Sequence, residues 1–188
     1  TQLFTPDWIV RYLVQNSLGR LWLENHPESS LREHMDYYVD DPTPEEIEEM
    51  DELYGTTDLE VVVADEGEDA ILKVSSPEEI KVLDPACGSG HMLTYAFELL
   101  YRIYEEEGYA PSQIATLILE NNLTGFEIDP RAAALASFAL AMKARERQRR
   151  YFTKKGPHGL PTQPNTQVIE PLTFTPEELA WLRDPNLP

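Results

Sequence analysis

The residues best suited to chemistry lie at positions 82–93, VLDPACGSGHML, where an apolar run ends at Asp84 and a loop of small residues follows. Such a loop lets a ligand approach the backbone closely, because glycine has no side chain. A dinucleotide fingerprint requires a third glycine in G-x-G-x-x-G, whereas Gly88 and Gly90 are followed by His-Met-Leu. A P-loop requires Gly-Lys-Ser or Gly-Lys-Thr, which occurs nowhere in the chain. The loop therefore favours a nucleoside ligand that is not anchored through phosphates.

Two further acids, Glu127 and Asp129, follow the next apolar run along the chain. The carboxyl ends of parallel strands meet at one edge of a sheet, so these acids and Asp84 are expected to lie near each other. S-adenosylmethionine fits such a site, because its amino acid end suits a glycine-rich loop and its ribose diol suits a carboxylate. Either acid could instead cap the following helix. Asp129 stands directly before Pro130 and is the better placed cap, which leaves Glu127 for a ligand.

The elements that position these residues alternate between strands and helices. Apolar periodicity predicts strands at 80–83, 123–128 and 166–169, and helices at 5–24, 91–107, 111–121 and 130–150. In the first helix, Thr5 is expected as the N-cap and Pro6 as the first helical residue. Gly108 is expected to end the helix at 91–107. This alternation predicts an α/β fold with a parallel sheet covered by helices on both faces, and with ligands at the carboxyl ends of the strands.

The chain is expected to have three parts. The segment 1–25 contains the first helix, an acidic insertion follows at 36–75, and an α/β core lies at 80–170. Positions 36–69 contain no Lys or Arg. Helix-start signals of the form Ser/Thr-Pro-Glu-Glu stand at 43–46 and 76–79, with a third at 175–178, and a hairpin is predicted from 59–64 and 70–74. Charge runs are usually solvated surface, and the alternative is a protein partner that binds the insertion.

Composition limits the class of protein. The 188 residues suffice for one core, so we expect a single domain at 1–188, and the absence of an initial Met suggests a fragment of a longer protein. Neither a membrane span nor a signal pattern is found, which predicts a cytoplasmic protein. Cys87 is the single cysteine and no metal-ligand spacing occurs. A net charge of −19 opposes nucleic-acid binding, and the basic cluster at 143–155 suits either a helix C-terminus or DNA.

Three segments together resemble a known family. FTPDWIV, LDPACGSGHML and TGFEIDPRA, in this order, resemble motifs X, I and II of the DNA methyltransferases that modify adenine N6, in the arrangement where motif X precedes motif I. Asp84-Pro85 alone could simply end a strand, and Thr5-Pro6 alone could simply cap a helix, so the resemblance depends on the combination. Within the family, the chain looks most like the methyltransferases of BREX-type phage-exclusion systems, followed by fused restriction-modification enzymes.

The resemblance implies part of a Rossmann-like class I methyltransferase fold with S-adenosylmethionine as the cofactor. It implies that Glu127 binds the two ribose hydroxyls and that Ile128 packs on the adenine ring. A contact from Glu170 to the adenine amine is a weaker implication, since the family usually has Asp there. The methionine end of the cofactor is implied to lie against Thr5, Pro6, Asp84, Pro85, Ala86, Gly88 and Gly90.

One departure from the family concerns catalysis. The family holds the target adenine with Asn-Pro-Pro-Tyr or a similar motif, and no such sequence occurs among the 188 residues, so no catalytic residue is assigned. We therefore expect the cofactor-binding part of an adenine-specific DNA methyltransferase that acts in restriction-modification or phage defence and is inactive alone, with DNA bound through other regions. The alternatives are a non-catalytic cofactor-binding or protein-interaction module, and a methyltransferase that acts on RNA or protein.

Overall fold

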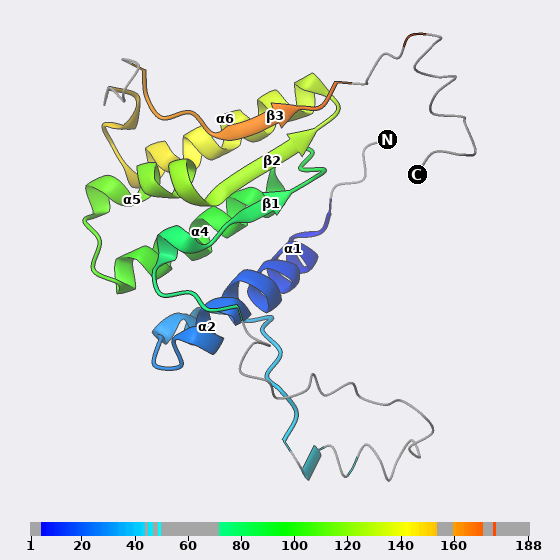
Figure 1. The fold of residues 1–188 in the computed structure, drawn as a ribbon, viewed down its shortest axis with the longest axis vertical. Helices are drawn as coiled ribbons and strands as arrows, with labels where there is room; N and C mark the ends of the chain where they lie inside the picture. The colour runs from blue at the N-terminus through cyan, green and yellow to red at the C-terminus, as the bar shows by residue number, and fades with distance from the viewer. Residues whose placement is uncertain are drawn as a thin grey trace.

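The computed structural model describes residues 5–43, 45, 46, 49, 72–153, 160–170 and 175. Within them a parallel sheet is formed by β1 (Val82–Asp84), β2 (Leu123–Glu127) and β3 (Asn165–Val168), in the order β1-β2-β3 (Figure 1). Asp84 pairs with Gly125, and Gly125 pairs with Thr166. The carboxyl ends of all three strands therefore lie at one edge of the sheet, as the sequence predicted.

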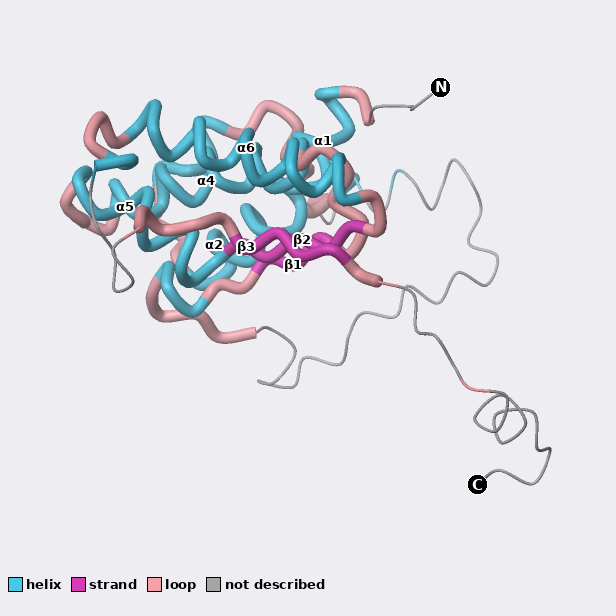
Figure 2. The backbone as a smooth tube through the Cα atoms, turned by 90° about the horizontal axis from the view of Figure 1, so that it is seen from above, coloured by secondary structure: helices cyan, strands magenta, loops and turns pink. Residues whose placement is uncertain are grey.

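Two long helices pack on one side of this sheet, namely α4 (His91–Glu106) and α6 (Pro130–Arg147) (Figure 2). On the other side, Leu83 of β1 is 55% exposed. The expected α/β architecture of a parallel sheet flanked by helices is confirmed. Helical cover on both faces was also expected, but the described part of the chain shows α4 and α6 on one side only.

The remaining helices are short or continue one another. The first predicted helix is present as α1 (Asp7–Val14), a π-helical stretch η1 (Gln15–Gly19) and α2 (Arg20–Asn25). The predicted helix at 111–121 is present as α5 (Pro111–Leu117) and η4 (Ile118–Asn122). Single 3-10 turns are η2 (Ser30–His34), η3 (Pro77–Glu79) and η5 (Tyr151–Thr153). Among the described residues, none of these helices combines the length and apolar character that a membrane span needs.

The predicted caps have mixed outcomes. Asp129 caps α6 by accepting a hydrogen bond from the Arg131 amide, and Gly108 ends α4 at φ +78°. The prediction that Thr5 caps the first helix was wrong, because Pro6 takes the N-cap position with its carbonyl and no side chain caps the helix. The capping box at 43–46 forms through Thr43 and Glu46. The predicted hairpin lies almost wholly outside the described residues, as does most of the third start signal.

A buried polar contact holds the chain where it enters β1. The Asn122 side chain is buried, accepts a hydrogen bond from the Tyr104 hydroxyl at 2.9 Å, and donates to the carbonyls of Pro77 and Ile80 at 2.7 and 2.8 Å. Burial raises the pKa of Tyr104, which keeps this hydroxyl a donor. The network connects the end of η4 to the segment before β1, so it helps to set the position of Asp84.

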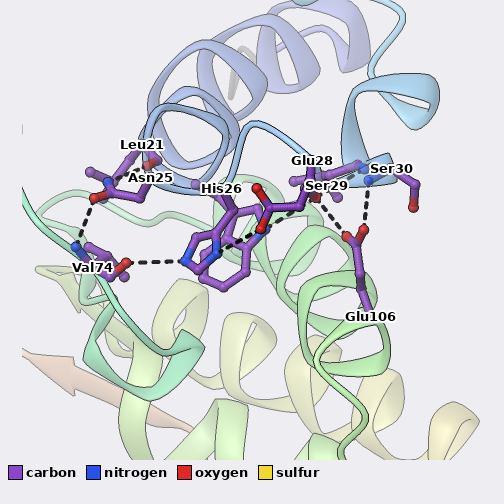
Figure 3. A network of polar contacts seen from close by, with 10 residues as sticks. Leu21, Asn25, His26, Glu28, Ser29, Ser30, Val74 and Glu106 are labelled. Carbon is purple, nitrogen blue, oxygen red and sulfur yellow. Dashed lines mark hydrogen bonds and ion pairs between the residues drawn. The ribbon is translucent and has the colours of Figure 1, made fainter.

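Figure 3 shows how the chain is held where it returns from the acidic insertion. His26 stacks on Trp22 with 3.8 Å between ring centroids, and its Nε2 lies 3.1 Å from the Val74 carbonyl. The Asn25 side chain accepts a hydrogen bond from the Val74 amide. Near the N-terminal end of the insertion, Asp41 forms an ion pair with Arg20 of α2. Both ends of the insertion are thus attached to the helix that precedes it.

An ion pair network connects α4 to α6. Glu98 accepts a hydrogen bond from Lys143 at 2.7 Å and a second one from Arg147, and the exposed fraction of its side chain is 22%. Partial burial acts to raise the pKa of the Glu98 carboxyl, but the hydrogen bonds from Lys143 and Arg147 outweigh it and lower the pKa. The arrangement predicts that the ionised Glu98 stabilises the packing of α4 on α6.

We expect Glu98→Gln to lower the free energy of unfolding by about 1 to 2 kcal/mol near neutral pH, because the two cations lose their anionic partner. A folded-state pKa below the unfolded value means that this contribution is present above the unfolded pKa and disappears as the pH falls through the folded pKa. Denaturant unfolding at pH 7 and at pH 3 measures it. The exposed Glu107→Gln is the control, and equal destabilisation by both variants would argue against the network.

Candidate functional site

The loop after β1 is fixed to β2 by main-chain contacts. The Cys87 amide donates to the Phe126 carbonyl at 2.8 Å, and the Gly90 amide donates to the Cys87 carbonyl at 2.7 Å. Asp84 Oδ1 accepts a hydrogen bond from the Ala86 amide at 3.1 Å. The loop between β1 and α4 is therefore a tight turn, with its backbone directed across the end of β2.

Glycine is required at two of the loop positions. Gly88 has φ +53° and Gly90 has φ +86°, both in the left-handed region that residues with a side chain rarely adopt. A Cβ added at Gly90 would lie 2.9 Å from the Cβ and 3.0 Å from the Cα of Ala136 on α6, whereas a Cβ at Gly88 would meet no atom within 4 Å. Gly90 therefore allows α4 and α6 to approach closely, and Gly88 leaves the outer side of the loop open.

The Glu127 carboxylate holds this loop against the start of α6. Its Oε2 accepts a hydrogen bond from the Gly88 amide at 2.7 Å, and its Oε1 accepts from the amides of Ile128 and Asp129 at 2.9 and 3.0 Å. These bonds, led by that from the Asp129 amide, lower the pKa of Glu127. A carboxylate has about four acceptor positions, so three of them are occupied by the backbone.

A hollow of about 570 Å³ lies beside the loop. This volume lies within the range of small-molecule sites. Of the residues predicted from the sequence, four line it, namely Thr5, Asp84, Ala86 and Gly88. The structure therefore brings the start of the first helix and the loop after β1 together around one cavity.

The other predicted residues lie outside the lining of this hollow. Gly90 is buried against α6, and Pro85 lines a separate groove between β1 and the first helix. Ile128 is 77% exposed, and its contact with an adenine ring stays a prediction. The remaining three predicted residues that do not line the hollow are Pro6, Glu127 and Glu170.

The hollow is also lined by residues that were not among the cofactor contacts predicted from the sequence. Asp129, for which the sequence favoured the role of helix cap over that of ligand contact, lines the hollow together with Arg131 and Leu135. The available signal was the position of Asp129 at the end of a parallel strand, where ligands are expected. The other unassigned lining residues are Cys87, Ser89, His91, Met92 and Ala132.

The charges around the hollow favour a cationic ligand. Burial, followed by the nearby charge of Glu127, raises the pKa of Asp84. Asp129 also lines the hollow, and its pKa is lowered, first by the bond from the Arg131 amide. Carboxylates attract the ammonium and sulfonium groups of S-adenosylmethionine and repel phosphates. The lining contains two carboxylates and one guanidinium, that of Arg131, so the hollow suits a ligand with a cationic group better than one that is anchored through phosphates.

Comparison with known proteins identifies the family of the chain. Residues 68–172 match the MmeI DNA-methyltransferase domain. The adenine-specific methyltransferase BrxX of Escherichia coli O9:H4 (strain HS) is 49% identical over 150 residues, which are 80% of this chain and 11% of that protein. The adenine-specific methyltransferase PglX of Lacticaseibacillus casei (strain Zhang) is 41% identical over 157 residues, which are 81% of this chain and 12% of that protein.

The chain thus spans 11% and 12% of the length of these two curated relatives. The family match covers more than half of the chain. It includes the loop after β1, the Glu127 carboxylate that holds this loop, and α6. The resemblance to BREX-type adenine-specific methyltransferases is confirmed, and the chain belongs to the MmeI DNA-methyltransferase domain family.

Proposed function

We propose that this chain is the S-adenosylmethionine-binding part of an adenine N6 DNA methyltransferase that acts in phage defence or restriction-modification in the cytoplasm. The observation that carries the proposal is the carboxylate-lined hollow beside the Gly88 and Gly90 loop, in a chain of this family. The fold is proposed to be part of a Rossmann-like class I methyltransferase. The parallel order β1-β2-β3, with helices after β1 and β2, supports this fold.

In this proposal the bound cofactor supplies a methyl group on a sulfonium, and the chain holds and orients it. Asp84 accepts hydrogen bonds from the cofactor's ammonium group, and its burial strengthens this interaction. Thr5 lines the same hollow. The open backbone at Gly88 lets the cofactor approach without a steric clash.

The ribose contact is proposed to be shared between two acids. Glu127 has about one acceptor position left after its three backbone bonds, which is too few for both hydroxyls of a diol. Asp129 lines the hollow, and its Oδ2 lies 3.5 Å from the Arg131 side chain, which is a weak contact. Glu127 thus fixes the loop and accepts one hydroxyl, while Asp129 accepts the other.

Calorimetric titration tests the choice of cofactor. We expect S-adenosylmethionine and its demethylated product S-adenosylhomocysteine to bind the 188-residue chain, and NAD and ATP to bind at least tenfold more weakly, because carboxylates face the hollow. Tight NAD or ATP binding would contradict the proposal.

A second expected result is that the 188-residue chain alone does not methylate DNA. A target adenine must leave the helix stack and be held in a pocket, and the chain contains no Asn-Pro-Pro-Tyr motif to hold it. When the acceptor is not positioned, the activation barrier loses a reduction of roughly 7 to 11 kcal/mol that comes from proximity and orientation. The test incubates the chain with tritiated S-adenosylmethionine and mixed-sequence duplex DNA, beside a longer protein that includes the motif. Label transfer by the short chain would show that its catalytic residues were overlooked.

A further inference from the structure

The outward face of α6 carries a row of five side chains, four of them exposed, which is here called the α6 seam. Its members recur at intervals of four and three residues, which is the a/d spacing of a helix that pairs with another helix. The seam consists of the exposed Arg131, Leu135, Phe138 and Met142, and of the half-buried Arg145. Its three apolar members are 58%, 64% and 45% exposed, in that order.

The packing of the described residues does not account for this apolar row. The face of α6 that packs on the sheet and on α4 is formed by other residues, namely Ala132, Ala133, Ala136, Leu140 and Ala144. A helix that is apolar on two faces is typical of one that is covered on both. The alanines at 134 and 139, beside the seam, would let a second helix approach closely. The seam therefore has the character of a contact surface.

The charges at the two ends of the seam limit what can cover it. Arg131 has a side chain that is 91% exposed and pairs with Asp129 at 3.3 Å, while Arg145 has no ion pair among the described residues. If two copies of the chain paired along this seam, arginines would face arginines in either helix direction. Like charges in contact disfavour such a pair. Carboxylates at both ends of a partner helix would instead complement the arginines.

We propose that the α6 seam binds one amphipathic helix from outside this chain, with apolar side chains at three central positions and Asp or Glu at both ends. Leu135 belongs to the seam and also lines the hollow beside the Gly88 loop. The bound helix therefore borders the candidate cofactor site. This inference does not depend on which reaction the chain serves.

The test uses a fluorescein-labelled synthetic helix of 21 residues with leucine at three successive seam positions and glutamate at the seam positions on either side. A matched peptide has lysine in place of these glutamates. We expect the glutamate peptide to bind the 188-residue chain at least tenfold more tightly, by fluorescence anisotropy. Phe138→Lys should weaken this binding at least tenfold with an unchanged melting temperature. Phe152→Lys, at a residue that is 51% exposed outside the seam, should leave binding unchanged.

Several outcomes would overturn the proposal. Equal binding of the two peptides, absence of binding, or binding that Phe138→Lys leaves intact would show that the seam does not recognise such a helix. A dimer in light scattering that Phe138→Lys abolishes would assign the seam to a second copy. Duplex DNA that displaces the peptide, and that loses affinity in Arg145→Glu, would assign it to nucleic acid.

Discussion

Gly90→Ala is expected to destabilise the chain by about 2 to 5 kcal/mol and to abolish measurable cofactor binding. The left-handed φ of +86° costs a residue with a side chain about 1 to 2 kcal/mol. The new methyl group would also lie 2.9 Å from the Cβ of Ala136, and overpacking of this kind costs about 1 to 3 kcal/mol more. Denaturant unfolding gives the stability, and titration with S-adenosylhomocysteine gives the affinity.

Gly108→Ala is the matched control for this effect. Gly108 also has a positive φ, of +78°, but a Cβ there would meet no atom within 4 Å. It ends α4 at the opposite end of the helix from the loop. We expect this variant to lose about 1 kcal/mol and to bind the cofactor normally. If Gly90→Ala were no worse than Gly108→Ala, the close approach of the loop to α6 would not matter.

Glu127→Gln is expected to lower both stability and cofactor affinity. An amide has one acceptor oxygen, so its NH₂ group must face either the Gly88 amide or the pair of amides that begins α6. Losing the charged acceptor costs about 1.5 to 3 kcal/mol, and the lower end applies because water reaches the loop. Affinity for S-adenosylhomocysteine should fall at least tenfold. Since the pKa of Glu127 is lowered in the folded state, the stability difference should shrink as the pH falls through that pKa.

Asp129→Asn distinguishes the proposed ligand contact of Asp129 from the role of Glu127 in holding the loop. Asparagine caps helices about as well as aspartate, so the α6 cap and the fold should remain. The carboxylate in the hollow is lost, and cofactor affinity should fall with an unchanged melting temperature. Glu127→Gln should differ from this variant by lowering both the cofactor affinity and the melting temperature. A Glu127→Gln variant with normal stability would show that its carboxylate does not hold the loop.

Much of the fold follows from local sequence signals. The apolar period, the Asp129-Pro130 start and Gly108 predicted α4 and α6 to within three residues, because each signal acts within one or two turns of the helix. The cap of the first helix was misplaced by one residue. There the Pro6 carbonyl accepts the first helical hydrogen bonds, from Ile9 and Val10. A threonine followed by proline cannot distinguish these two arrangements from sequence alone.

The candidate site was predictable in position but not in detail. Asp84 and Gly88 were found because a strand end and a glycine-rich loop are sequential features. The contact of Glu127 with the loop was not, since it depends on how the Gly88 amide in the loop after β1 meets a carboxylate 39 residues away in the chain. Asp129 was expected at this edge of the sheet but was assigned to the helix cap in preference to the ligand. A helix cap was a sufficient reason for an aspartate at position 129, although one carboxylate can cap α6 and also line the hollow.

Nuclear magnetic resonance of the ¹⁵N-labelled chain during titration with S-adenosylhomocysteine tests the central claim most directly. The account predicts that the largest amide shifts occur at 84–92 and 127–132, with the Gly88 and Asp129 amides among them, and that shifts at the C-terminal end of α6 are small. An unchanged spectrum at millimolar ligand, or shifts concentrated away from the loop after β1, would contradict the claim that this hollow binds the cofactor.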